Sequence, residues 1–346
     1  DAALIARARA MMPYVHQLFE NAMVVSSLSA LGTGALGAIC DQLGDSTMAI
    51  RLLAGVEVDS GAPSRAMWEL GRVAQSSAEV TAAFETDPRS VVERLEADGG
   101  GDARAFLARF EQFLRDHGSR AQNEYDPRAP SWELSPSVAL VAIDLMRKSD
   151  EAQAPAVRNS VSVEERERVA SDIRSQIADD AETAALFESA LASAHLFLAG
   201  RERGKTNTVR VINEARVALY EYGRRLVERG VIDDVEQLFM VTDEELDALR
   251  AEPESFTDII SERWTQYRQL FDYEPVFAVN GRVPTLDEMI PRGDKDVASV
   301  SAGDVLRGAA GSGGVASGRA RVVTDAGDPA GLEPGDVLIA PQTDPA

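Results

Sequence analysis

Residues 162–200 read "SVEERERVASDIRSQIADDAETAALFESALASAHLFLAG", and their apolar side chains recur about every three to five positions. That spacing gathers the apolar side chains on one face of an α-helix. Ser162 followed by Glu165 matches a capping box, which predicts that the helix begins there. Residues 205–230, "KTNTVRVINEARVALYEYGRRLVERG", repeat the pattern, and Gly230 is placed to end that helix. We therefore expect two consecutive long amphipathic helices.

The same periodicity extends over most of the chain. It predicts further helices at 14–54, 64–86, 103–117, 136–148 and 257–271. A short helix is expected after Thr242, which forms a second capping box with Glu245. Because strand patterns are scarce before residue 274, we expect residues 1–273 to form one large multi-helix domain.

The composition changes near residue 274. Residues 274–302 contain several prolines and glycines and are expected to be a linker with at most one hairpin. From 303 to 346 short runs of Gly, Val and Ala predict strands, ending in "GDVLIAPQTDPA" at 335–346. About 45 residues cannot bury a core alone without disulfides or metal. The predicted fold is therefore mainly α, followed by a partial β-rich domain, and we expect the chain to be a piece of a longer polypeptide.

Charge and cysteine content restrict the possible partners and environment. The net charge of -22 argues against nucleic acid, whose binding requires a basic surface. The one cysteine, Cys40, lies in an apolar stretch, so we expect a buried thiol and no intrachain disulfide. No uninterrupted apolar run approaches the roughly 18 to 20 residues of a membrane span. The sequence predicts a soluble, cytoplasmic protein that binds neither nucleic acid nor membrane.

"GTGALG" at 32–37 matches the dinucleotide-binding fingerprint. A working fingerprint follows a strand and opens a helix, so that the pyrophosphate meets free backbone N–H groups. Here a helical pattern runs through the motif. We therefore favour a close helix contact or a loop over a nucleotide site.

"RDHGSRAQNEYD" at 115–126 gathers polar side chains where a predicted helix ends. His117 could act as a base, Arg120 as an anion ligand and Glu124 as a carboxylate in a binding site. The alternative is a helix end at Gly118 with surface ion pairs, which contribute little stability. The residue types alone favour that alternative.

A second polar cluster, "GRERGK" at 200–205, places Arg201 and Lys205 four residues apart. On a helix, that spacing puts both cations on one face, which could bind a phosphoryl group during transfer. Alternatively Glu202 could neutralise Lys205 through an i,i+3 ion pair on a solvated face. His195, six residues upstream of Arg201, is expected to be a packed helix residue.

The C-terminal motifs "GSGGVASGRARVV" and "PGDVL" followed by "TDP" resemble the opening of the mobile phosphohistidine domain of the phosphoenolpyruvate-utilising phosphotransferases. Residues 201–246 and 117–133 resemble helical segments of the rifampin phosphotransferase branch of that superfamily. The resemblance implies a helical acceptor-binding domain at 1–273, a linker at 274–302, and at 303–346 the start of a swivelling domain whose catalytic histidine lies beyond this chain.

The resemblance also implies a mechanism and site residues. An ATP-grasp domain outside this chain would use ATP and Mg²⁺ to phosphorylate the histidine, which would pass the phosphoryl group to a hydroxyl of a small-molecule acceptor. ATP would yield AMP and phosphate. The family's Arg-Glu-x-x-Lys group corresponds to Arg201, Glu202 and Lys205, with Arg120, Glu124 and His117 as substrate-binding residues. No metal and no cofactor are expected on this chain itself.

Two alternatives remain open at this point. The chain could belong to phosphoenolpyruvate synthase or pyruvate phosphate dikinase, which a pyruvate-binding barrel after the histidine domain would indicate. It could also be a non-catalytic helical binding module, which a replaced histidine would favour. The sequence does not identify the acceptor.

Overall fold

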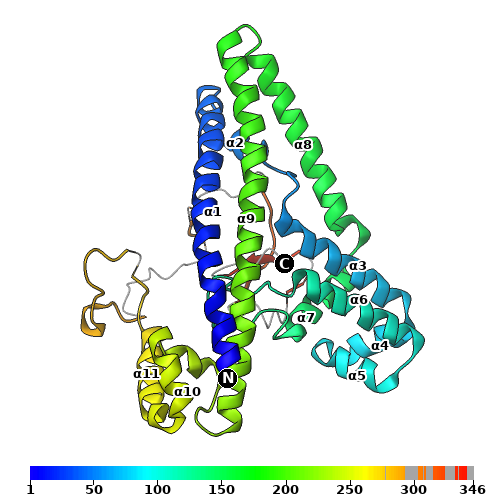
Figure 1. The fold of residues 1–346 in the computed structure, drawn as a ribbon. Helices are drawn as coiled ribbons and strands as arrows, with labels where there is room; N and C mark the ends of the chain where they lie inside the picture. Colours follow the sequence, from blue (N-terminus) through cyan, green and yellow to red (C-terminus); the bar gives the residue numbers. More distant parts are fainter. Residues whose placement is uncertain are drawn as a thin grey trace. The chain divides into compact units, whose positions relative to one another are not determined.

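The structure, a computed structural model, describes residues 1–276, 278–292, 303–306, 308, 315–323, 332–333 and 335–340, and helices dominate it (Figure 1). The α-helices are α1 (Ala2–Gln42), α2 (Thr47–Arg51), α3 (Ala62–Ser76), α4 (Ala78–Thr86), α5 (Val91–Asp98), α6 (Gly101–His117), α7 (Pro136–Lys148), α8 (Pro155–Gln176), α9 (Ala181–Glu228), α10 (Leu246–Ala251) and α11 (Thr257–Gln269). The strands are β1 (Ala320–Val322) and β2 (Val337–Ile339). The predicted mainly α fold is confirmed.

Short 3₁₀ helices lie between these elements. They are Asp59–Gly61, Pro88–Ser90, Glu151–Gln153, Val235–Met240, Asp243–Glu245, Pro253–Phe256, Leu270–Asp272 and Leu286–Glu288. The chain divides into two compact units, one formed by residues 1–11 with 214–309 and the other by 12–213 with 310–346. We call these unit 1 and unit 2. The domain limits predicted at 273 and 302 stay a prediction.

Unit 2 has two apolar cores, and the first is formed by α3, α4, α5, α6 and α7. Three phenylalanines of α6, spaced three or four residues apart, face this core: Phe106, Phe110 and Phe113. The Phe106 and Phe110 rings stack with centroids 6.2 Å apart, and Phe113 stacks on Trp132 at 5.8 Å. Because buried aromatic side chains remove much apolar area from water, this row fixes α6 in the core.

The second core of unit 2 joins α1, α2, α8 and α9. It buries Leu36, Leu52, Ile173 and Phe187, together with the thiol of Cys40, as predicted. The parts of α1 and α9 in unit 2 lie side by side (Figure 1). Their backbones approach closely at Gly32, where an added methyl group would lie only 2.8 Å from the amide nitrogen of Ala194. "GTGALG" is therefore a helix–helix contact, one of the two alternatives favoured over a nucleotide site.

Unit 1 has a core of its own around the last turns of α9, α10 and α11. Tyr222, Leu226, Leu249 and Ile260 are buried there. Gly230 adopts a φ of 72° just after α9, and its N–H donates to the Val227 carbonyl at 2.9 Å. This is the helix end predicted at Gly230, because glycine adopts that left-handed conformation without a steric penalty.

The second predicted capping box is also present in unit 1. The Thr242 N–H donates to Glu245 Oε2 at 2.9 Å, and the reciprocal bond completes the motif. Arg263 donates to the same carboxylate, and these hydrogen bonds lower the pKa of Glu245 to about 2. A charged Glu245 therefore ties α11 to the start of the Asp243–Glu245 turn.

The helix ends predicted around 162 and 200 are wrong. Ser162 lies inside α8, and its hydroxyl donates to the Arg158 carbonyl instead of capping a helix. No break follows Gly200, because α9 runs without interruption through 181–228. A Cβ at Gly200 would meet Val25 at 3.3 Å, so the glycine serves close packing against α1 rather than a turn.

Other helix limits also differ from the prediction. α1 begins at Ala2 rather than 14, with Pro13 inside it, and it ends at Gln42 before the short α2. The helix predicted at 64–86 is divided at Ser77, whose side chain accepts from the Val80 N–H at 3.4 Å and starts α4. α5 was not predicted. The helices predicted at 103–117 and 136–148 are confirmed by α6 and α7.

The C-terminal strands lie where the sequence predicted β structure. β1 and β2 pair in parallel, with Arg321 opposite Leu338. Asp336 accepts hydrogen bonds from Arg319 at 3.2 Å and from Arg321 at 3.1 Å. Tyr273, the last residue of the predicted helical domain, forms an antiparallel bridge with Pro291 of the predicted linker. Much of the predicted phosphohistidine segment, at 309–314, 324–331 and 341–346, lies outside the described residues.

Two of the helices are long and apolar enough to cross a membrane by length and mean hydropathy. They are α1 and α9. The sequence criterion, which required an uninterrupted apolar run, was therefore too strict. A long helix with a few charged residues can still have a mean hydropathy as high as that of a membrane span. The soluble and cytoplasmic character stays a prediction.

We predict that Gly32→Ala destabilises the protein while Gly34→Ala does not. At Gly32 the added methyl meets the backbone of α9 at 2.8 Å, which the neighbour cannot relieve by rotating a side chain. Overpacking of this kind costs about 1–3 kcal/mol. At Gly34 a Cβ has nothing within 4 Å, so alanine should stabilise the helix by about 0.5–1 kcal/mol. Urea unfolding of the two variants measures the difference, and equal stabilities would contradict the close contact.

Candidate functional site

The loop between α6 and α7 carries the first predicted cluster. The loop begins at Gly118, where a larger residue would not fit. α6 ends at His117, and a Cβ on Gly118 would lie 2.2 Å from the Leu114 carbonyl oxygen. The chain then folds back on itself. The Trp132 N–H donates to the Arg120 carbonyl at 2.8 Å, and the Glu133 N–H donates to the Gly118 carbonyl at 2.8 Å. Residues 118–133 therefore form a closed loop whose ends are hydrogen-bonded.

α9 holds this loop at three points. Arg210 donates to the Asp116 carbonyl at 3.2 Å, and Asn213 donates to Glu133 Oε2 at 2.7 Å, so both ends of the loop are attached. The middle is attached by Lys205, whose Nζ lies 2.8 Å from Glu124 Oε2. The structure thus brings the two predicted clusters together, although they lie far apart in the sequence.

Arg120 and Glu124 form a buried ion pair, not the surface pair that the residue types favoured. Arg120 Nη1 lies 3.0 Å from Glu124 Oε1, and the side chains are only 9% and 11% exposed. In the described part of the structure Nη1 makes no aligned hydrogen bond, so the contact is ionic. Two charges taken out of water are tolerated only when each is compensated. Glu124 is therefore needed where it lies, between Arg120 and Lys205.

The second cluster differs from the predicted i,i+3 arrangement. Glu202 pairs with its neighbour Arg201 at 2.9 Å, while Lys205 pairs with Glu124. The Glu202 side chain is 13% exposed, whereas the Arg201 side chain is 49% exposed. Arg201 is thus paired with one acid, and about half of its side-chain surface remains open to solvent. Such an arginine can bind an anion that approaches from the solvent.

Two aromatic residues that the sequence analysis missed lie beside these charges. The rings of Phe19, on α1, and Tyr125 have centroids 5.5 Å apart. Burial raises the pKa of the Tyr125 hydroxyl, which also lies in the field of Lys205 and Glu124. Tyr125 follows Glu124 directly and could have been included for that reason. Nothing in the sequence pointed to Phe19, because only the tertiary structure places it next to the loop.

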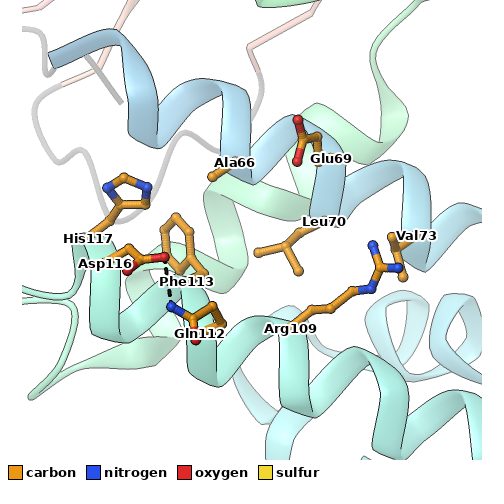
Figure 2. A pocket seen from close by; sticks show the side chains of 9 residues that line it. All are labelled: Ala66, Glu69, Leu70, Val73, Arg109, Gln112, Phe113, Asp116 and His117. Atoms are coloured by element: carbon orange, nitrogen blue, oxygen red, sulfur yellow. Dashed lines mark hydrogen bonds between the residues drawn. The ribbon is translucent and has the colours of Figure 1, made fainter. Parts of the chain in front are cut away.

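The third predicted substrate-binding residue, His117, faces a different space. It lines a cavity of about 210 Å³ between α3 and α6, whose lining does not include Arg120, Glu124 or Lys205 (Figure 2). Burial lowers the pKa of His117, and among the nearby charges Asp116 opposes this shift while Arg210 and Arg120 add to it. His195 is a packed helix residue, as predicted, since its Nε2 lies 2.8 Å from the Leu52 carbonyl oxygen.

Among the described residues, no group of three or more His, Cys, Asp or Glu side chains is arranged to hold a metal ion. The site instead consists of arginine and lysine side chains with acidic partners. Chemically it can bind and neutralise an anionic group through Arg201 and Lys205, and it contains carboxylates that can accept a proton.

Comparisons with known proteins identify relatives of the chain. Residues 19–202 match the family described as the rifampicin phosphotransferase fourth domain. The uncharacterized phosphotransferase YvkC of Bacillus subtilis is 26% identical over 298 residues, 81% of this chain and 34% of that protein. The rifampicin phosphotransferase of the same organism is 28% identical over 270 residues, 75% of this chain and 29% of the enzyme. The chain therefore spans about a third of the length of these two relatives.

A third relative is similar over a shorter segment. An uncharacterized protein of Mycobacterium tuberculosis is 35% identical over 148 residues, which cover 42% of this chain and 16% of that protein.

We predict that Glu124→Gln destabilises the protein by about 3–5 kcal/mol, because it leaves the buried Arg120 charge without its counter-ion. The matched control is Glu111→Gln on α6. Glu111 also pairs with an arginine four residues away, but those side chains are 72% and 54% exposed. Loss of that exposed pair should change stability by less than about 1 kcal/mol. Denaturant unfolding measures the stability of both variants. Equal effects of the two substitutions would show that burial of the Glu124 ion pair does not contribute to stability.

The lowered pKa of His117 predicts a pH dependence of stability. The unfolded chain titrates near the ordinary value of about 6.5, while the folded protein binds the proton only at lower pH. Between these two pKa values the unfolded state binds more protons, so stability should fall as the pH drops through about 6.5. The loss should level off below the folded pKa. Unfolding from pH 8 to pH 5 should show a weaker pH dependence in His117→Gln than in the parent protein, and an identical dependence would refute the assignment.

Proposed function

Because the chain belongs to the rifampicin phosphotransferase fourth-domain family, we propose that it forms the acceptor-binding helical part of an ATP-dependent phosphotransferase. In this proposal a phosphohistidine, carried on a swivelling domain, passes its phosphoryl group to a hydroxyl of a small-molecule acceptor bound here. The observation that carries the proposal is the half-exposed Arg201 beside Glu202, one helical turn from Lys205.

The chemistry of transfer fits these side chains. The N–P bond of the phosphohistidine breaks as the new P–O bond forms, and charge on the equatorial phosphoryl oxygens must be neutralised. Arg201 offers a planar pair of donors for those oxygens, and Lys205 adds a point charge on the same helix. We assign the hydroxyl proton to the Glu202 carboxylate, which lies 2.9 Å from the Arg201 guanidinium. Arg120 and Glu124 hold Lys205 in place.

The acceptor would need an apolar part as well as a hydroxyl. Phe19 and Tyr125 are 41% and 47% exposed, next to the charged cluster. Exposed aromatic rings beside fixed charges suit a ligand that presents a flat apolar surface and a polar group together. Rifampicin, the acceptor named for the Bacillus subtilis relative, is therefore a reasonable first compound to test.

In this proposal ATP and Mg²⁺ bind to another domain of the protein. An ATP-grasp domain would convert ATP to AMP and phosphate while phosphorylating the histidine, and the helical part would take no role in that step. The match over 19–202 and the two named phosphotransferases support this arrangement over phosphoenolpyruvate synthase. A non-catalytic binding module would retain the fold but have no use for an open Arg201.

The test is Arg201→Ala in the protein that carries this chain together with its ATP-grasp and phosphohistidine domains. Histidine phosphorylation by ATP should be unchanged, whereas transfer to the acceptor should fall about 100- to 1,000-fold, the usual effect of removing one transition-state donor. Radiolabelled phosphate on the histidine and on the acceptor measures both steps, starting with rifampicin and extending to other hydroxyl compounds.

The matched control is Arg203→Ala. Arg203 lies two residues away on α9, its side chain is 71% exposed, and its partner is Asp59 at 3.5 Å. It should leave both steps unchanged. Loss of both steps in Arg201→Ala, or of neither, contradicts the proposed role of Arg201.

A further inference from the structure

The cavity between α3 and α6 is distinct from the proposed phosphoryl site. Figure 2 shows its lining side chains, which come from these two helices. Leu70 and Phe113 form a buried apolar floor, and Ala66 and Val73 extend it along α3. The cavity measures about 210 Å³, which is enough for a small organic molecule. The cavity is open to solvent, so a ligand can enter it, and its rim carries charged side chains.

Three polar side chains of the lining have no polar partner in the part of the protein that the structure describes. Among the described residues, no hydrogen bond or ion pair is made by the side chains of Glu69, Arg109 or His117. Neighbouring arginines behave differently. Arg115, also on α6, pairs with Glu111, and Arg72, on α3, donates to the Met146 carbonyl at 2.6 Å. An acid and a base that face one cavity without pairing with each other are available to a ligand.

The charges are separated along the cavity. In Figure 2, Asp116 and His117 lie at one end, Arg109 lies at the other, and Glu69 projects from α3 between them. Asp116 already accepts a hydrogen bond from Gln112 at 2.9 Å. The ring of Phe113 lies beside Asp116 and His117, and Leu70 lies between the two ends. A ligand in this space would therefore meet the cation of Arg109, the anion of Glu69 and an aromatic surface.

We propose that this cavity binds a small zwitterion with an apolar body, of the kind represented by an aromatic amino acid. Its carboxylate pairs with Arg109, its ammonium group pairs with Glu69, and its apolar body packs on Phe113 and Leu70. A simple anion would be repelled by Glu69 and Asp116, and a simple cation would leave Arg109 without a counter-ion. His117, whose imidazole is kept neutral by burial, supplies a hydrogen bond without adding charge.

The experiment compares three probes that share a phenyl ring. L-Phenylalanine carries both charges, 3-phenylpropionate only the carboxylate, and 2-phenylethylamine only the ammonium group. Their binding is followed by NMR of the His117 ring, whose signals are assigned by their loss in His117→Gln. L-Phenylalanine should shift these signals saturably and bind about fivefold or more tightly than either singly charged probe, as expected for a partly solvated ion pair.

Substitutions test which residue recognises which charge. Arg109→Gln should weaken L-phenylalanine about fivefold and leave 2-phenylethylamine unweakened, while Glu69→Gln should weaken L-phenylalanine and leave 3-phenylpropionate unweakened. Both residues are exposed, so neither substitution should affect folding. The control is Arg104→Gln, which also lies on α6 but lines a separate cavity of about 630 Å³. It should change no affinity.

Several results would overturn the proposal. These are no saturable shift of the His117 signals, equal affinities for the three probes, or affinities unaffected by Arg109→Gln and Glu69→Gln. None of these results depends on phosphoryl transfer, since Arg201 and Lys205 do not line this cavity. Failure of the zwitterion site therefore leaves the proposed phosphotransferase role untouched, and the reverse also holds.

Discussion

The carboxylate of Glu124 is the group on which the candidate site depends. One oxygen lies 3.0 Å from the guanidinium of Arg120 and the other lies 2.8 Å from the ammonium of Lys205. Arg120 is buried in the loop, and Lys205 belongs to α9. A single buried acid therefore compensates two cations and joins a loop to a helix. Because isolated buried charges are costly, each of the three side chains restricts where the other two can lie.

The hydrogen bonds of the loop also help to fix the position of Glu124. The backbone hydrogen bonds at Gly118 and Arg120 close the loop that presents Glu124. Arg210 and Asn213 attach the ends of the loop to α9. The proposed phosphoryl site thus rests on a helix and on a loop that the helix fixes, and rigid elements of this kind position charge more accurately than free loops.

The sequence predicted the fold class better than it predicted which charged residues contact one another. Apolar periodicity located α6 and α7 correctly, and the resemblance to phosphoenolpyruvate-utilising phosphotransferases is confirmed by the family match over 19–202. The errors have physical causes. Gly200 looked like a helix break but allows close packing, and Ser162 looked like a cap but lies within α8.

Pairings between distant residues were the least predictable part of the site. Periodicity reports which face of a helix is apolar, yet it does not say which acid lies opposite Lys205. The local rule suggested Glu202 at i,i+3, whereas the tertiary structure supplies Glu124 from another segment. His117 was grouped with Arg120 because they are close in sequence, but its ring lines the cavity next to α3. Roles for these residues in transfer stay predictions.

The two glycines of α9 that face α1 have a consequence for how transfer could occur. Gly200 and Gly204 are one turn apart, and a Cβ on them would meet Val25 at 3.3 Å and Ala22 at 3.9 Å. Arg201 and Lys205 each follow one of these glycines, so the part of α9 that carries both cations packs closely against α1, while the helix geometry sets their spacing. The helix backbone at the two cations is therefore held in place against α1. In the proposed function, the phosphoryl group would therefore be delivered by movement of the carrier domain toward a fixed acceptor site.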